Sequence, residues 1–161
     1  MLFRSIKVNV SCLLADEFKG DNCEAFVSGL RVCDEKFSFC FYPDVLVICG
    51  ELEIYDAAEG IMHNPKVIIE VLSPTTKAHD RGEKFTSYRQ LASLTDYILI
   101  SQDKPLIRHF VRQPYNAWLF LKESDLANSI FIESIECSLP LKNVYARVQF
   151  PMKELLPEAL D

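Results

Sequence analysis

The segment from Pro65 to Tyr88 constrains the fold more than any other part of the chain. It begins with Val67–Leu72, a continuous apolar run rich in β-branched residues, which is typical of a central strand buried on both faces. Glu70 places a carboxylate in the middle of this run. Because an ionised carboxylate is costly to bury, it needs a cation or several hydrogen-bond donors beside it. The sequence therefore predicts either a structural ion pair with an Arg or Lys, or a metal ion.

A second carboxylate stands at the start of another predicted strand. Asp44 follows Pro43 and opens the apolar run Val45–Ile48, and a proline is suited to the first position or the edge of a strand. Two acids on neighbouring core strands can converge on one divalent cation. Mg²⁺ is usually held by one or two carboxylates together with waters and substrate phosphate. Asp44 and Glu70 therefore predict a magnesium site, with Mn²⁺ as the substitute metal.

A helix is predicted directly after the Glu70 strand. Ser73-Pro74 breaks the strand, and helix-forming sequence runs from about Lys77 to Ala92, with Asp80 as one candidate N-cap. Four side chains on this helix share one stripe at spacings of three and four, and this stripe can point back over the end of the Glu70 strand. The four are Lys77, Arg81, Lys84 and Tyr88. For Lys77 and Arg81, a solvated helix face is the alternative.

These features together resemble the Uma-two family of putative restriction endonucleases, which belongs to the PD-(D/E)XK nuclease superfamily. The similarity runs from roughly Leu2 to Trp118 and rests on the order and spacing of three motifs. The motifs are Pro43-Asp44, the sequence EVLSP at Glu70–Pro74, and the spacing of Asp80, Lys84 and Tyr88.

The resemblance implies a Mg²⁺-dependent endonuclease that hydrolyses phosphodiester bonds in DNA. It implies that Asp44 and Glu70 bind the metal, with the backbone carbonyl of Val71 as a third protein ligand. In the superfamily, a lysine two residues after the glutamate acts on the attacking water or the phosphate, but here that position is Leu72. Lys84 matches the lysine that this family carries on the following helix. The catalytic residues implied are therefore Asp44, Glu70 and Lys84.

The predicted fold class is α/β, with a restriction-endonuclease-like core in which helices flank a mixed central sheet. The helix between the Glu70 strand and the predicted strand Asp96–Ser101 is a crossover, so those two strands should run parallel. The 161 residues predict one domain, with a core at about residues 2–121 and C-terminal strands and turns at 122–161.

The other predicted elements follow from local patterns. Leu2–Lys19 is predicted as an amphipathic helix that faces the core. Glu24–Arg31 and Phe37–Ile48 are predicted as a hairpin that leads into the Asp44 strand, and Gly50–Asn64 as the long acidic connection that follows. Ile107–Arg112 and Ala117–Leu121 are predicted as a second hairpin after the crossover. Short edge strands are expected at 131–132 and 137–139, and helical turns at 143–146 and 152–156.

The charge balance argues against general affinity for nucleic acids. The net charge is −6, whereas proteins that bind phosphates usually present a basic face. A local basic stripe and a bound Mg²⁺ can offset an acidic remainder. Arg108 and Arg112 alternate on one strand face beside Phe110, which is either a ladder facing DNA or surface decoration.

The six cysteines show no C-x-x-C pair, so a zinc site is not expected. With no secretory signal, they are interpreted as reduced core residues of a cytoplasmic protein. No segment is long and apolar enough to span a membrane. Among the three histidines, His63, His79 and His109, the spacing selects none as a catalytic base.

Two alternatives to an active enzyme remain open. Members of the family usually carry a segment before the first helix, whereas this chain opens almost inside that helix. It is therefore either an active nuclease or an inactive or N-terminally truncated nuclease-fold protein that serves as a binding or scaffold domain. The second alternative is a metal-free structural domain in which Glu70 is paired with Lys84. Because cutting both strands of a duplex usually needs two sites, a homodimer is expected.

Overall fold

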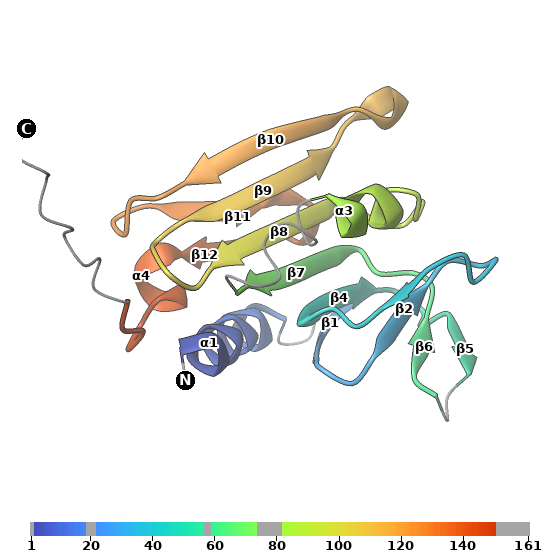
Figure 1. The fold of residues 1–161 in the computed structure, drawn as a ribbon, viewed down its shortest axis with the longest axis horizontal. Helices are drawn as coiled ribbons and strands as arrows, with labels where there is room; N and C mark the ends of the chain where they lie inside the picture. Colours follow the sequence, from blue (N-terminus) through green and yellow to red (C-terminus); the bar gives the residue numbers. More distant parts are fainter. Residues whose placement is uncertain (1, 19–21, 57–58, 74–81, 151–161) are drawn as a thin grey trace, which may run out of the picture.

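The computed structural model describes residues 2–18, 22–56, 59–73 and 82–150. Its centre is a six-stranded sheet (Figure 1). In chain order and also in spatial order, the strands are β1 (Cys23–Val27), β4 (Val45–Cys49), β7 (Val67–Leu72), β8 (Asp96–Ser101), β9 (Ile107–Arg112) and β10 (Trp118–Glu123). β7 and β8 run parallel, as the crossover rule predicts, and the other neighbouring pairs are antiparallel. The fold is therefore α/β with a mixed central sheet.

Helices lie on both faces of this sheet (Figure 1). They are α1 (Leu2–Glu17), α3 (Glu83–Tyr88) and α4 (Leu141–Val144), with short 3-10 helices η1 (Pro114–Asn116) and η2 (Glu133–Ile135). The helix predicted at the N-terminus is observed and ends at Glu17. In the described part of the chain, no helix has the length and apolar character that crossing a membrane requires.

Strand β7 is the buried centre that the apolar run predicts. All six of its residues are buried, and alternate side chains point to opposite layers. The odd-numbered ones pack in a cluster with α1, while Ile68 and Leu72 pack in a cluster with Tyr88 of α3. Glu70 has the same parity as Ile68 and Leu72, so its carboxylate faces the layer that contains α3.

The α1 face of the sheet is closed by the C-terminal elements. Ile6, Val10 and Leu14 recur at a spacing of four on α1 and are fully buried. They share one hydrophobic cluster with residues of α4 and of a two-stranded sheet, β11 (Ser129–Ile132) and β12 (Cys137–Pro140). The short strands and helical turn predicted there are thus observed. The turn predicted at 152–156 lies outside the described residues.

A second sheet of four short strands lies beside β1 and β4 (Figure 1). Its order is β3 (Cys40–Phe41), β2 (Arg31–Cys33), β6 (Ile61–Met62) and β5 (Ile54–Asp56). The predicted hairpin is therefore only partly correct: β1 pairs with β4, but the chain between them enters this second sheet. The chain turns at Ser28 and Gly29, which have φ of 60° and 85°. The connection 50–64, predicted as a long acidic loop, contains β5 and β6.

Helix α3 ends at Tyr88, four residues before the predicted end at Ala92. An arginine from β9 binds the carbonyls that follow it. The Arg112 guanidinium donates to the carbonyl oxygens of Arg89, Leu91 and Leu94 at 2.9, 2.9 and 2.6 Å. It also stacks on the Trp118 ring at 4.6 Å. Arg112 therefore holds this turn in place, so neither alternative considered for it, a ladder facing DNA or surface decoration, describes this role. The predicted start of the helix, with Lys77, Asp80 and Arg81, lies outside the described residues.

The prediction that all the cysteines are reduced is wrong for four of them. Disulfides join Cys23 to Cys49 and Cys33 to Cys40. The physical reason is strand register, since each pair consists of directly opposed residues on antiparallel strands, β1 with β4 and β2 with β3. Among described residues Cys12 and Cys137 are free thiols, and burial raises the pKa of the Cys137 thiol to about 11. The cytoplasmic location stays a prediction, without the support of reduced cysteines.

Candidate functional site

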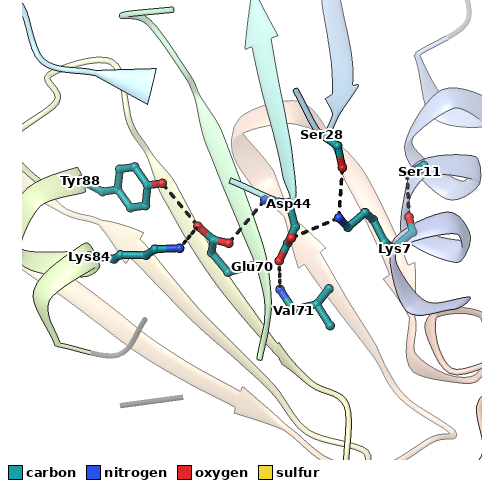
Figure 2. A network of polar contacts seen from close by, with 8 residues as sticks. All are labelled: Lys7, Ser11, Ser28, Asp44, Glu70, Val71, Lys84 and Tyr88. Carbon is teal, nitrogen blue, oxygen red and sulfur yellow. Dashed lines mark hydrogen bonds and ion pairs between the residues drawn. The ribbon is translucent and has the colours of Figure 1, made fainter. Parts of the chain in front are cut away.

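Asp44, the residue directly before β4, and Glu70 of the neighbouring strand β7 lie side by side (Figure 2). The pairing between these strands ends at Val45 opposite Ile69, so β7 continues past the start of β4. The Asp44 side chain extends the contact, because its Oδ2 accepts a hydrogen bond from the Val71 N–H at 2.8 Å. The Asp44 N–H in turn faces Glu70 Oε2 at 3.4 Å. The structure thus brings the two predicted acids together.

Lys84 supplies the cation that the buried Glu70 carboxylate requires. Its Nζ lies 3.3 Å from Glu70 Oε1, and the Glu70 side chain is only 3% exposed. Helix α3 lies over the even-numbered face of β7, so Lys84 and Tyr88, the two members of the predicted stripe that the structure describes, point at Glu70. Tyr88, one turn further on, is fully buried and has its hydroxyl 3.4 Å from the same oxygen. The Lys84 ammonium also lies 5.7 Å from the centre of the Phe41 ring.

Lys7 of α1 is the site residue that the sequence argument missed. Its Nζ lies 3.2 Å from Asp44 Oδ1 and donates to the Ser28 hydroxyl at 3.1 Å. Figure 2 shows Lys7 and Lys84 approaching the acid pair from opposite sides. A signal was available, since Lys7 precedes the buried Val10 and Leu14 by three and seven residues. This spacing places it along the core-facing stripe of the helix.

The donor chemistry of the acid pair fits a hard divalent cation. Carboxylate oxygens are the ligands that Mg²⁺ prefers, and one or two of them are enough when waters complete the coordination. No group of three or more His, Cys, Asp or Glu suited to a metal occurs in the described part of the chain. Each carboxylate already has a lysine partner, so a metal ion would have to compete with Lys7 and Lys84. The role of the Val71 carbonyl as a ligand stays a prediction.

His109 belongs to a buried hydrogen-bond network around Asp96. Its Nε2 lies 2.6 Å from Asp96 Oδ1, and both side chains are at most 2% exposed. The hydroxyls of Thr95 and Ser134 also donate to Asp96. Burial alone would raise the pKa of Asp96, but these hydrogen bonds and the His109 charge outweigh it and hold that pKa below its ordinary value. The network ties β8 to β9 and η2.

The Nδ1 of His63 lies 2.7 Å from the Cys33 carbonyl oxygen, an interaction within the four-stranded sheet. His79 lies outside the described residues.

The fold and the site together define a class of protein. A mixed sheet with a parallel crossover pair, an aspartate and a glutamate meeting on adjacent core strands, and a lysine on the crossover helix are features of a restriction-endonuclease-like fold. Residues 4–139 match the model of the Uma2 (Uma-two) family, which is described as "Putative restriction endonuclease". The chain belongs to this family.

Two similar proteins come from Synechocystis sp. strain PCC 6803, and both are described as uncharacterized. The protein sll1609 is 35% identical over 111 residues, which are 69% of this chain and 63% of that protein. The protein slr1290 is 29% identical over 145 residues, 90% of this chain and 75% of that protein. The chain therefore spans less than two thirds of the length of the first relative.

A solved structure shares the fold. It is the crystal structure of a protein from Anabaena variabilis ATCC 29413, described as a putative nuclease belonging to DUF820. The two structures superpose with a TM-score of 0.76 over 92% of this chain and 83% of the other, at 14% sequence identity.

Proposed function

We propose that this chain is a Mg²⁺-dependent DNA endonuclease whose catalytic residues are Asp44, Glu70 and Lys84. The observation that carries the proposal is the convergence of two carboxylates from adjacent buried strands, with a lysine 3.3 Å from one of them. Buried charges of this kind are commonly kept where a protein binds a metal or a charged substrate. Membership of a family described as restriction endonucleases supplies the substrate class.

Each residue has a role that its chemistry permits. The carboxylates of Asp44 and Glu70 would hold the metal, with the Val71 carbonyl as third protein ligand and Mn²⁺ as an alternative ion. When bound, Mg²⁺ lowers the pKa of a coordinated water and neutralises charge on the scissile phosphate. Lys84 would orient the attacking water or stabilise the pentacovalent transition state, because a positioned ammonium group is suited to the negative charge that develops there.

One observation favours a second candidate, a nuclease-fold domain that binds without cutting. Both carboxylates are already matched by an ammonium group, Asp44 by Lys7 at 3.2 Å and Glu70 by Lys84 at 3.3 Å. Such a site is electrically balanced without a metal, and the net charge of −6 disfavours DNA elsewhere on the surface. Metal binding therefore separates the two candidates.

The assembly we propose is a homodimer, because cutting both strands of a duplex usually needs two active sites. Edge strand β10 supports this proposal. Its side chains Leu119, Phe120 and Leu121 are 47%, 49% and 46% exposed, and consecutive exposed apolar residues on a sheet edge favour pairing with another strand.

The decisive experiment compares the wild type with Asp44→Asn/Glu70→Gln. Thermal unfolding is measured with and without millimolar Mg²⁺ or Mn²⁺, and both proteins are then incubated with supercoiled plasmid DNA. The control is Asp103→Asn/Glu133→Gln, which makes the same chemical changes at exposed positions. We expect the metal to raise the melting temperature of the wild type and the control but not of the site variant.

Nicking of the plasmid should follow the same pattern. A wild type that shows neither a metal-dependent shift nor cleavage would contradict the endonuclease and favour the binding domain. A metal shift without cleavage would support the metal site and contradict the catalytic assignment.

A further inference from the structure

We infer that Lys7 and Ser28 form a phosphate-binding subsite for the DNA backbone, on the opposite side of the acid pair from Lys84. This inference rests on the proposed function, since it assumes that the chain acts on DNA. It assigns to helix α1 a part in substrate binding that neither the motifs nor the family description includes.

The Lys7 ammonium is held at the site from two directions. It lies 3.2 Å from Asp44 Oδ1 and 3.1 Å from the Ser28 hydroxyl. Its side chain is 16% exposed, and that of Asp44 is 17% exposed, so both are in reach of a ligand from solvent. Glu70, by contrast, is only 3% exposed. Asp44 and Lys7 are therefore more exposed than Glu70, and Lys84, on the other side of the acid pair (Figure 2), is exposed to a similar extent at 15%.

Ser28 has a backbone conformation that is uncommon for a residue with a Cβ. Its φ is 60°, in the left-handed region that is unfavourable for residues other than glycine. The Ser28 N–H donates to the Asp44 carbonyl oxygen at 3.2 Å. The turn is thus fixed to the backbone of the metal-binding aspartate and places the Ser28 hydroxyl next to the Lys7 ammonium. Lysine and serine side chains are among the usual donors to DNA phosphates.

Charge balance explains why a second cation is needed. Two carboxylates side by side would repel a phosphate group, and Lys84 can neutralise only one of them. With Lys7 present, the two carboxylates and two ammonium groups sum to zero. An ammonium group has three N–H donors, so Lys7 can keep its ion pair with Asp44 while a phosphate oxygen replaces the Ser28 hydroxyl as its other acceptor.

The test measures how DNA affinity depends on salt, with EDTA present so that no metal contributes. Binding of a fluorescent duplex of about 30 base pairs is followed by anisotropy between about 50 and 200 mM NaCl. The proteins are the wild type, Lys7→Gln and the control Lys142→Gln, which removes an exposed lysine of α4. Losing one phosphate contact should reduce the slope of log K against log salt by about 0.9. It should also weaken binding about eight-fold at about 0.1 M salt. Lys142→Gln should keep the wild-type slope.

A second pair of variants protects the test against misfolding, because Lys7→Gln leaves Asp44 without its ion pair. Asp44→Asn keeps Lys7 without the acid, and Asp44→Asn/Lys7→Gln removes both charges. The slopes of log K against log salt of these two proteins should also differ by about 0.9.

The outcomes separate the inference from the proposed function. If the wild type binds and nicks DNA but Lys7→Gln keeps the wild-type slope, the phosphate subsite is wrong and the endonuclease stands. If Lys7→Gln loses the contact while the wild type shows no cleavage, the subsite stands and the catalytic proposal fails. If the wild type binds no DNA at low salt in EDTA but nicks plasmid DNA with Mg²⁺, the subsite is wrong and the endonuclease stands; if it neither binds nor nicks DNA, both are wrong.

Discussion

At the scale of single residues, Glu70 places a buried negative charge in the central strand. Its carboxylate is 3% exposed and lies 3.3 Å from the Lys84 ammonium. The Tyr88 hydroxyl and the Asp44 N–H are both 3.4 Å from this carboxylate and are longer than good hydrogen bonds. Of these three contacts, Lys84 alone brings a positive charge.

We predict that Lys84→Met lowers the free energy of unfolding by on the order of 3 kcal/mol, because it removes a cation from beside a buried carboxylate. Adding Glu70→Gln should restore part of this loss, since the buried charge is then gone. Urea denaturation in EDTA measures Lys84→Met, Glu70→Gln and the double variant. Lys142→Met, at an exposed position, serves as the control.

Glu70→Gln by itself distinguishes the two candidate functions. If Glu70 is a metal ligand, its charge opposes that of Asp44 in the metal-free protein, and the variant should be as stable as the wild type or more so. If Glu70 is only half of a structural ion pair, the variant should be less stable. That second result would favour the binding domain.

At this scale, the sequence identifies candidate site residues only where a charged residue interrupts or opens a recognisable apolar strand pattern. Glu70 stands out because a charge interrupts an apolar run, and Asp44 because it opens a strand after a proline. Lys7 does not stand out, because a lysine on an amphipathic helix is usually solvated. Its role depends on a contact with Asp44 that links distant parts of the chain, and no local pattern reports such a contact.

At the scale of elements, local patterns located strands that cross the core. The bounds of β7, β8 and β9 agree with the predicted ranges, because β7 and β8 are short, largely apolar runs and β9 alternates apolar with basic residues, each between turn residues. The four-stranded sheet was not predicted. Its strands have two or three residues each, and β2 pairs in parallel with β6, far along the chain. Such pairing depends on tertiary contacts and leaves no periodic signal.

The disulfides give a prediction about these elements. The Cys23–Cys49 bond closes a loop with a sequence separation of 26, and Cys33–Cys40 one of 7. Loop-closure entropy then predicts losses of about 3.5 kcal/mol for Cys23→Ser/Cys49→Ser and about 2.4 kcal/mol for Cys33→Ser/Cys40→Ser. Urea denaturation without reductant measures both.

Thiol counting provides the control for that experiment. Alkylation of the unreduced, denatured protein should modify two of the six cysteines, and all six after reduction. Six modified thiols without reductant would show that the bonds are absent, and equal losses in the two variants would contradict the entropic account.

At the scale of the whole molecule, the sheet has one edge that is unusually apolar. Within the described ranges, β10 pairs with β9 alone. Natural edge strands usually carry charges, proline or bulges that prevent pairing with another chain. Three consecutive large apolar residues near the middle of β10 are instead about half exposed. Such an edge favours a partner strand.

A second copy of β10 is a suitable partner. With a two-fold axis perpendicular to the sheet at Phe120, antiparallel pairing places Phe120 opposite its own copy and Leu119 opposite Leu121. Residues directly opposite in an antiparallel pair share a face, so the apolar side chains of both copies would meet. Both edges would then be joined in one continuous sheet, an isologous contact of the kind that closes a dimer.

We predict that Phe120→Glu converts the dimer to a monomer, because like charges directly opposite each other destabilise strand pairing. Light scattering after size-exclusion chromatography measures the mass of each protein. Phe131→Glu is the matched control, since Phe131 is an exposed phenylalanine on a different sheet, at 57%. A monomeric wild type, or two variants that both stay dimeric, would contradict pairing through β10. If the endonuclease proposal also holds, the monomeric variant should still nick plasmid DNA but should form less linear product, because one molecule then carries only one site.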